Sequence, residues 1–110
     1  MKITRGDYKI FKIQRISDGE VIKELPEKMY FTVKKDYYTD KILIQKTLEN
    51  GIQKDDEDYY NIEIVSSDTD NLNYGKYVCD IEIKNGNKPK TIFKDEFIIE
   101  EEVTFAKNEV

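Results

Sequence analysis

The sequence contains no histidine and no tryptophan, and Cys79 is its single cysteine among 110 residues. Without histidine the chain lacks the commonest general base and metal ligand, which excludes Ser-His-Asp and Cys-His nucleophiles. One cysteine cannot form a disulfide within the chain. Because Cys79 lies on the inward row of an alternating segment, we expect a buried, unreactive thiol. We predict no enzymatic activity, no cofactor and no metal site.

Long apolar runs and an excess of positive charge are also missing. No apolar run approaches the roughly 20 residues of a membrane span, and residues 1–7 lack the apolar core and cleavage site of a signal peptide. Acidic residues outnumber basic ones by 23 to 18, giving a net charge of −5. We therefore expect a protein made in a reducing compartment that binds neither nucleic acid nor membrane, since both need a basic surface.

The apolar residues that are present follow a period of two, which is typical of strands with one wet face. Turn signals separate these segments at residues 17–19, 49–51 and 85–86. The clearest inward rows are Met29, Phe31 and Val33, then Tyr60, Ile62 and Ile64, then Tyr77, Cys79, Ile81 and Ile83. Only residues 66–72 suit a helical turn. The pattern predicts an all-β, antiparallel sandwich of about seven strands, with a small open barrel as the alternative.

Length predicts a single domain over residues 1–104, and residues 105–110 are expected to be a frayed tail.

Residues 68–83 have the pattern of a tight polar corner that leads into a strand, with Tyr77 two residues before Cys79. An immunoglobulin-like sandwich enters its sixth strand in this way, with the corner tyrosine bonded to the upstream backbone. The predicted structural corner consists of Asp70, Leu72, Tyr74, Gly75 and Tyr77.

Exposed tyrosines are the candidate interface residues, because aromatic side chains are enriched in protein interfaces. The outward positions of Tyr30, Tyr37, Tyr38 and Tyr59 make them the candidates. Good strand propensity is the alternative reason for tyrosine at such positions.

The acidic residues 55–58 and Asp68 with Asp70 do not match an EF-hand loop, and weak calcium binding by a loop stays open.

Several segments resemble a known family: residues 3–13, 29–35, 70–83 and 101–105. Together they are similar to the immunoglobulin-like domain of bacteriophage baseplate upper proteins and of short prophage proteins from Gram-positive bacteria. The residues that occupy the family's pattern are Gly6, Asp7, Phe11, Leu72, Tyr74, Gly75, Tyr77 and Asp80. The resemblance implies a role in virion assembly, in the tail or baseplate, without enzymatic activity.

The leading hypothesis is a phage or prophage structural protein, made in the bacterial host cytoplasm and located in the virion. It would dock onto tail, baseplate or capsid components, or onto itself, through a sheet face or an edge strand. A carbohydrate- or cell-surface-binding module is one alternative. The chain lacks tryptophan, however, the side chain whose ring is best suited to stack against a sugar. A small cytoplasmic phage regulator acting by protein–protein binding is the other.

Overall fold

Ten strands and one single-turn helix make up residues 1–103, the part of the chain that the computed structural model describes. The predicted all-β class is confirmed. The predicted frayed tail, residues 105–110, lies outside the described residues. In chain order the elements are β1 (Lys2–Thr4), β2 (Lys9–Gln14), β3 (Ile16–Ser17), β4 (Glu20–Val21), β5 (Lys28–Lys34), β6 (Ile42–Thr47), β7 (Ile52–Lys54), β8 (Tyr59–Ile64), α1 (Ser66–Thr69), β9 (Gly75–Asn85) and β10 (Lys88–Glu100).

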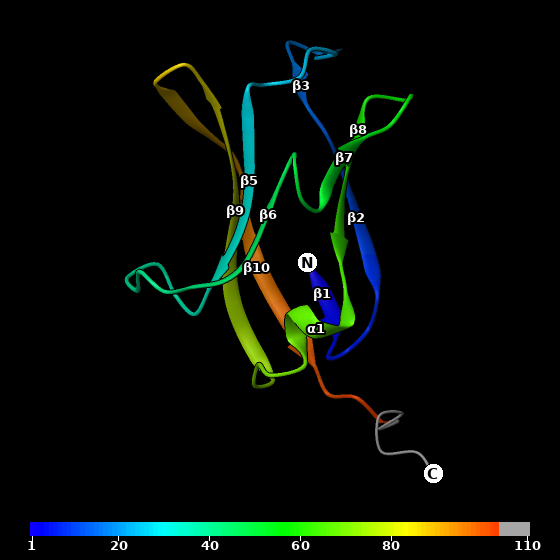
Figure 1. Cartoon of the computed structure of the whole chain (residues 1–110), viewed down its shortest axis with the longest axis vertical. Helices are drawn as coiled ribbons and strands as arrows, with labels where there is room; N and C mark the ends of the chain where they lie inside the picture. Colours follow the sequence, from blue (N-terminus) through cyan, green and yellow to red (C-terminus); the bar gives the residue numbers. More distant parts are fainter. Residues whose placement is uncertain (104–110) are drawn as a thin grey trace.

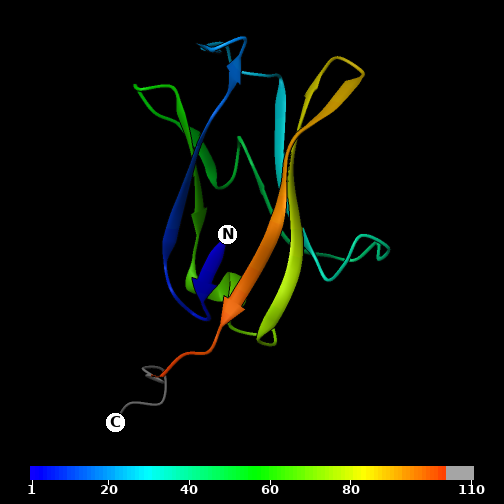
Figure 2. The ribbon, with the colours of Figure 1, turned by 180° about the vertical axis from the view of Figure 1, so that it is seen from behind.

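The strands form two layers that face each other across the core (Figure 1). One sheet has the order β1-β10-β9-β5-β6, and the other has the order β2-β8-β7. All neighbours in these sheets are antiparallel except β1 and β10, which pair in parallel with Ile3 opposite Ile99. The view from behind shows the same two layers, with the short β3–β4 hairpin beyond one end of them (Figure 2).

The core lies between the layers and consists of the predicted inward rows. Residues of the rows on β5, β8 and β9 are at most 5% exposed. Phe97 of β10 lies at the centre, with its ring centroid 6.1 Å from those of both Phe11 and Phe31. Burying a large apolar side chain contributes roughly 1.5–3 kcal/mol, so these alternating rows are the main stabilising feature of the sandwich.

The number of strands differs from the prediction of about seven. Three of the ten strands are very short: β3 and β4 have two residues each and β7 has three. β7 was not predicted, because three residues between Gly51 and an acidic turn are too few to establish a period of two. By contrast, β9 and β10 are long strands and form a hairpin that ends in the turn at residues 86–87. In residues 1–103, no helix has the length and apolar character of a membrane span.

Candidate interaction surface

The corner before β9 is an internal brace. The Tyr77 hydroxyl donates a hydrogen bond of 2.6 Å to the carbonyl oxygen of Asn73, four residues upstream. Burial raises the pKa of Tyr77, because the phenolate would lose its hydration. Gly75 has φ of +136°, a conformation that residues with a side chain rarely adopt. The corner thus supplies one satisfied buried hydroxyl and one glycine-dependent bend.

The remaining corner residues hold this end of the molecule together. The Arg5 guanidinium lies over the Tyr74 ring at 4.2 Å from its centroid and donates to the Leu72 carbonyl. Two nitrogens of Arg5 also donate to one carboxylate oxygen of Glu102, at 3.0 and 2.7 Å. Asp70 packs beside the β1–β2 turn, where its Oδ1 accepts a hydrogen bond from Ser66. These side chains bind one another, so we assign them a structural role.

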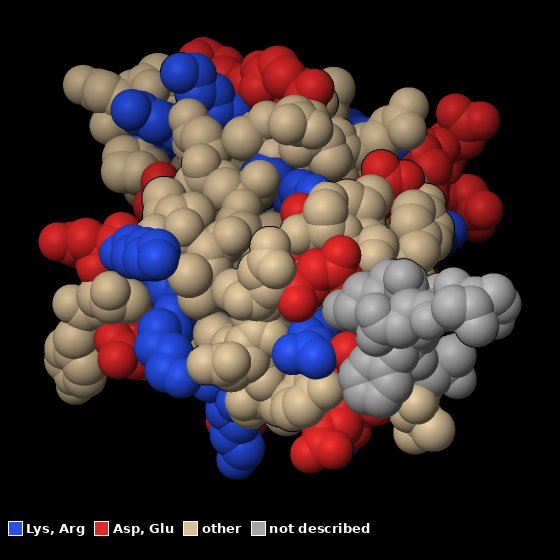
Figure 3. All heavy atoms as spheres, turned by 60° about the horizontal axis from the view of Figure 1, so that its bottom comes forward, with Lys and Arg blue, Asp and Glu red and all other residues tan. Residues whose placement is uncertain are grey.

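Figure 3 views the end of the molecule at which α1 and Arg5 lie. Acidic and basic side chains are interspersed on this end, and neither sign covers it. Such a surface has little to attract a highly charged ligand, because the fields of closely spaced opposite charges largely cancel and salt screens what remains beyond a Debye length.

A buried ion pair next to the corner was missed by sequence reasoning. Lys46 of β6 points into the core, and its Nζ lies 2.7 Å from Oδ2 of Asp68 in α1. The same oxygen accepts the backbone N–H of Val65 at 2.8 Å. The sequence did contain a signal for the inward lysine. Lys46 follows the buried Ile44 by two residues, so both side chains point to the same face of β6. The pair connects the edge of the five-stranded sheet to the link between β8 and β9.

The structure gathers three of the four candidate tyrosines around one sheet. Tyr30 is half-buried on the outer face of β5, whereas Tyr37 and Tyr38 lie in the β5–β6 loop and are 63% and 95% exposed. Tyr59 begins β8 on the other sheet, with Lys12 Nζ 5.9 Å from its ring centroid. A surface that uses Tyr30, Tyr37 and Tyr38 therefore leaves Tyr59 out.

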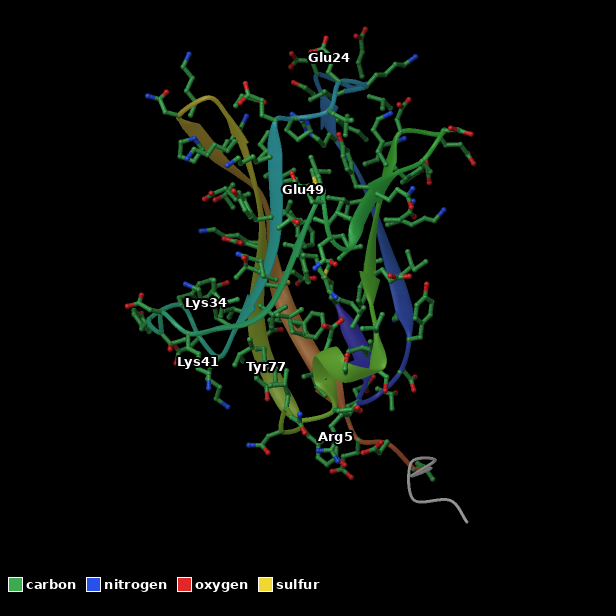
Figure 4. All side chains as sticks on the ribbon, viewed as in Figure 1. Arg5, Glu24, Lys34, Lys41, Glu49 and Tyr77 are labelled. Atoms are coloured by element: carbon green, nitrogen blue, oxygen red, sulfur yellow. The ribbon has the colours of Figure 1, made fainter. Side chains whose placement is uncertain are left out.

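The β5–β6 loop projects to the side from the five-stranded sheet, next to Lys34 and Lys41 (Figure 4). The loop is shaped by Asp36, whose Oδ1 accepts the backbone N–H groups of Tyr38 and Thr39 at 2.9 and 3.0 Å. These bonds hold the chain in a tight turn. The tyrosine pair thus stands on a defined loop beside the sheet.

Two shallow hollows adjoin on the outer face of this sheet. One has a volume of about 380 Å³ and the other about 230 Å³, and they share Thr32, Lys34 and Asp80. Their remaining lining residues are Tyr30, Ile42, Gln45, Glu82 and Lys84 in the larger hollow, and Asp36, Tyr37, Val78, Cys79, Thr91 and Lys94 in the smaller one. We call this surface, together with Tyr38 of the β5–β6 loop, the tyrosine face. It combines the tyrosine rings, which are enriched in protein interfaces, with several charged side chains.

Cys79 is buried on the inward side of β9, as predicted. Its Sγ lies 3.4 Å from the carbonyl oxygen of Asp95. Burial raises the pKa of this thiol to about 11, so the neutral form dominates near neutral pH. Within residues 1–103, no group of three His, Cys, Asp or Glu side chains is placed to hold a metal ion.

The acidic segment at residues 55–58 forms the β7–β8 turn. Asp55 Oδ1 accepts the backbone N–H groups of Glu57 and Tyr59, and Asp55 Oδ2 accepts the Asn61 amide. These bonds, with that from Asn61 foremost, lower the pKa of Asp55. The Asp55 carboxylate thus shapes the turn by accepting hydrogen bonds from the residues that follow it.

The chain matches no protein-family model, and no curated protein matches it in sequence.

Proposed function

We propose that this chain is an immunoglobulin-like structural protein of a phage or prophage virion, which docks onto tail, baseplate or capsid components through the tyrosine face. The strand order supports the fold. Immunoglobulin-like sandwiches place strands B, E and D in one sheet and G, F and C in the other, with C′ added in variable-type domains. The sheets β2-β8-β7 and β10-β9-β5-β6 correspond to these strands in chain order.

The corner provides a second, independent support for the fold. Tyr77 lies at the start of β9, the strand equivalent to F, and two residues before Cys79. Its hydrogen bond to the Asn73 carbonyl is the bond that defines a tyrosine corner. The phage assignment is supported by the resemblance of residues 3–13, 29–35 and 70–83 to baseplate immunoglobulin-like domains.

The docking role depends chiefly on one observation: Tyr37 and Tyr38 are exposed on a shaped loop that borders the two hollows. Tyrosine offers a large apolar area with little conformational entropy to lose, and it is frequent among residues that dominate binding energy. Docking would bury these rings and the half-exposed Tyr30. It would also cover Lys34 and Asp80, which line both hollows, so the docked protein must offer charged or polar partners to them.

The strand edges are less suited to pairing with another chain. β1 and β7 have three residues each, and β6 has a register irregularity opposite Val33 and Lys34 as well as the inward Lys46. β2 carries Lys9 and Lys12. Short edges, irregular pairing and lysine are features that discourage edge-to-edge association. We therefore favour the sheet face over edge-strand pairing.

The test is whether the protein is part of purified phage particles. In a producing strain whose only copy is epitope-tagged, we expect mass spectrometry and immunoblotting to find the protein in gradient-purified particles. Tyr37→Ser should lower its incorporation about tenfold, the effect of losing a dominant interface residue.

The matched control is Tyr8→Ser, because Tyr8 is 60% exposed, close to the 63% of Tyr37, and it lies outside the tyrosine face. We expect this variant to enter particles normally. Absence of the protein from particles, together with abundance in the lysate, would contradict the virion role. Equal loss of Tyr8→Ser and Tyr37→Ser would contradict the tyrosine face. Strong signals on a glycan array would favour the carbohydrate-binding alternative.

A further inference from the structure

A hollow of about 410 Å³ opens between the β2–β3 stretch on one side and β10 on the other. Both ribbon views show β3 and the β9–β10 hairpin at this end of the molecule, opposite α1 (Figures 1 and 2). Within residues 1–103, β10 has no second neighbour there, because β1 pairs only with Ile98, Ile99 and Glu100. The side of the sandwich is therefore not closed by a strand at the hollow.

Most of the lining of the hollow is apolar. It includes five isoleucines and one phenylalanine, which are Ile13, Ile16, Ile22, Ile83, Ile92 and Phe93. Ile83 belongs to the core and is 5% exposed, whereas Ile16 is 60% exposed. The hollow thus extends from the core to the surface. Its volume lies within the roughly 300–1,000 Å³ of small-molecule sites, which are likewise mainly apolar.

Two cationic side chains, Arg15 and Lys90, line the hollow from its two sides. No acidic residue is among the lining residues, and no carboxylate in residues 1–103 forms an ion pair with either cation. Arg15 is half-buried, and its Nη1 donates to the carbonyl oxygen of Glu24 at 3.2 Å. This bond leaves Nε and Nη2 of the guanidinium to bind an anion, since no acceptor in the described part of the chain is bonded to them.

Acidic side chains are present near the hollow, although they do not line it. The exposed acids of the β3–β4 hairpin and of the link to β5 are Asp18, Glu20, Glu24 and Glu27. Glu27 is turned to the β9–β10 turn, where its Oε2 accepts the backbone N–H of Gly86. Together with the net charge of −5, these acids oppose the approach of an anion from a distance. A bound anion must therefore be held by direct contact with Arg15 and Lys90, and a single negative charge is favoured over a double one.

An extended peptide is less suited to the hollow than a small molecule. Pro89 has no N–H to donate to a further strand, and the register of β10 shifts between Thr91 and Phe93. Lys88 and Lys90 add positive charge to the same stretch. Proline, irregular pairing and lysine all discourage the addition of a strand.

We propose that the hollow binds a small amphipathic carboxylic acid, with its apolar chain against the isoleucines and its carboxylate bound by Arg15. Lys90, on the facing strand, provides a second positive charge. A guanidinium binds a carboxylate through two parallel hydrogen bonds, which fixes the orientation of the ligand. The inference does not depend on the proposed virion role, because it uses a different surface.

Titration of the isotope-labelled 110-residue chain with octanoate, followed by proton–nitrogen correlation spectra, provides the test. We expect saturable shifts that are concentrated in the amide signals of residues 13–17 and 90–93. Absence of saturable shifts, or saturable shifts confined to other residues, would overturn the proposal.

Octylammonium is the matched ligand, because it has the same apolar chain and the opposite charge. The net charge of −5 attracts cations, so a preference for octanoate must come from the local cations Arg15 and Lys90. We expect octanoate to bind at least about tenfold more tightly than octylammonium. Equal binding of the two ligands would overturn the role of the cations. Acetate lacks the apolar chain, and binding of acetate as tight as that of octanoate would overturn the role of the isoleucines.

Two variants test the cations one at a time. Arg15→Met and Lys90→Met remove a positive charge and keep an apolar side chain of similar length. We expect each variant to bind octanoate about threefold or more weakly, and the double variant at least about tenfold more weakly. Binding of octylammonium should not weaken in any of them.

The matched control is Lys76→Met, which removes one lysine from an exposed position at the other end of the β9–β10 hairpin. We expect this control to bind octanoate as the unaltered chain does. Circular dichroism of every variant verifies folding. Unchanged octanoate affinity in the folded double variant, or equal weakening in Lys76→Met and Lys90→Met, would overturn the proposed site.

Discussion

Tyr77 places an aromatic ring in the core and a hydroxyl at its boundary, so one residue both packs and closes the corner. We expect Tyr77→Phe to lower the free energy of unfolding by about 1 kcal/mol or more, because the part-buried hydrogen bond from Tyr77 to the Asn73 carbonyl is lost. Urea denaturation monitored by circular dichroism measures the effect. Tyr8→Phe is the control, since the Tyr8 hydroxyl donates to Glu63 in an exposed position where water can replace it. An unchanged midpoint for Tyr77→Phe would contradict the assigned bond energy.

A side chain at position 51 would be unfavourable for two reasons: the backbone conformation and the space available for a Cβ atom. Gly51 has φ of +104°, and a Cβ there would lie 2.5 Å from Cδ of Lys46. We expect Gly51→Ala to destabilise the protein by about 2 kcal/mol or more, since strain and overlap add.

Gly19→Ala is the matched comparison for Gly51→Ala. Gly19 also has positive φ, at +78°, but a Cβ there meets nothing within 4 Å. We expect a cost of about 1 kcal/mol from backbone strain alone. Equal losses at the two positions, compared by thermal unfolding, would show that contact with Lys46 adds nothing.

At the scale of elements, the Lys46–Asp68 pair fixes the edge strand β6 against α1. Their side chains are 11% and 18% exposed. We expect Lys46→Met to destabilise the protein by about 1–3 kcal/mol, because the Asp68 carboxylate is left without its cation. The loss is smaller than for a fully buried pair, since water reaches part of both side chains. Asp68→Asn should have a similar effect.

A double-mutant cycle separates the interaction from side effects of each change. The variant with both Lys46→Met and Asp68→Asn should lose less stability than the two single losses added together, because neither charge is then left alone. Additive losses in urea denaturation would mean that the two charges do not interact.

The strands themselves were largely predictable. Residues 29–35 and 77–83 alternate so regularly that burial on one face fixes the strand. The β9–β10 turn was predicted to within one residue: the sequence signal lies at Asn85 and Gly86, and the two-residue loop consists of residues 86 and 87, with positive φ at Gly86. Short segments were not predictable: β7 has three residues, and β4 ends after Val21. A period of two needs more residues than these segments contain.

The candidate site was predictable only in part. Tyr37 and Tyr38 could be identified as exposed from their place in a polar connection. Their grouping with Tyr30, and the separation of Tyr59, could not, because these depend on which strand lies in which sheet. The inward direction of Lys46 followed from its position two residues after Ile44. Its partner Asp68 lies in α1, far along the chain, and leaves no local signal.

At the scale of the whole molecule, β10 is the strand on which the five-stranded sheet depends. It lies between β1 and β9 and contributes Phe97 to the centre of the core. We expect a chain that ends at residue 87 to lack a folded state, because β1 then has no partner and the core loses its central ring. Proton–nitrogen correlation spectra would show collapsed amide dispersion, whereas the full chain disperses well. A dispersed spectrum from the shortened chain would contradict this role.

The parallel pairing of β1 with β10 also has a consequence during synthesis. Ile3 must find Ile99 across almost the whole described chain, and contacts of such wide sequence separation form late. During translation, β1 therefore stays unpaired while the residues between it and β10 are synthesised. Until β10 is available, nascent chains expose that segment to chaperones and to one another.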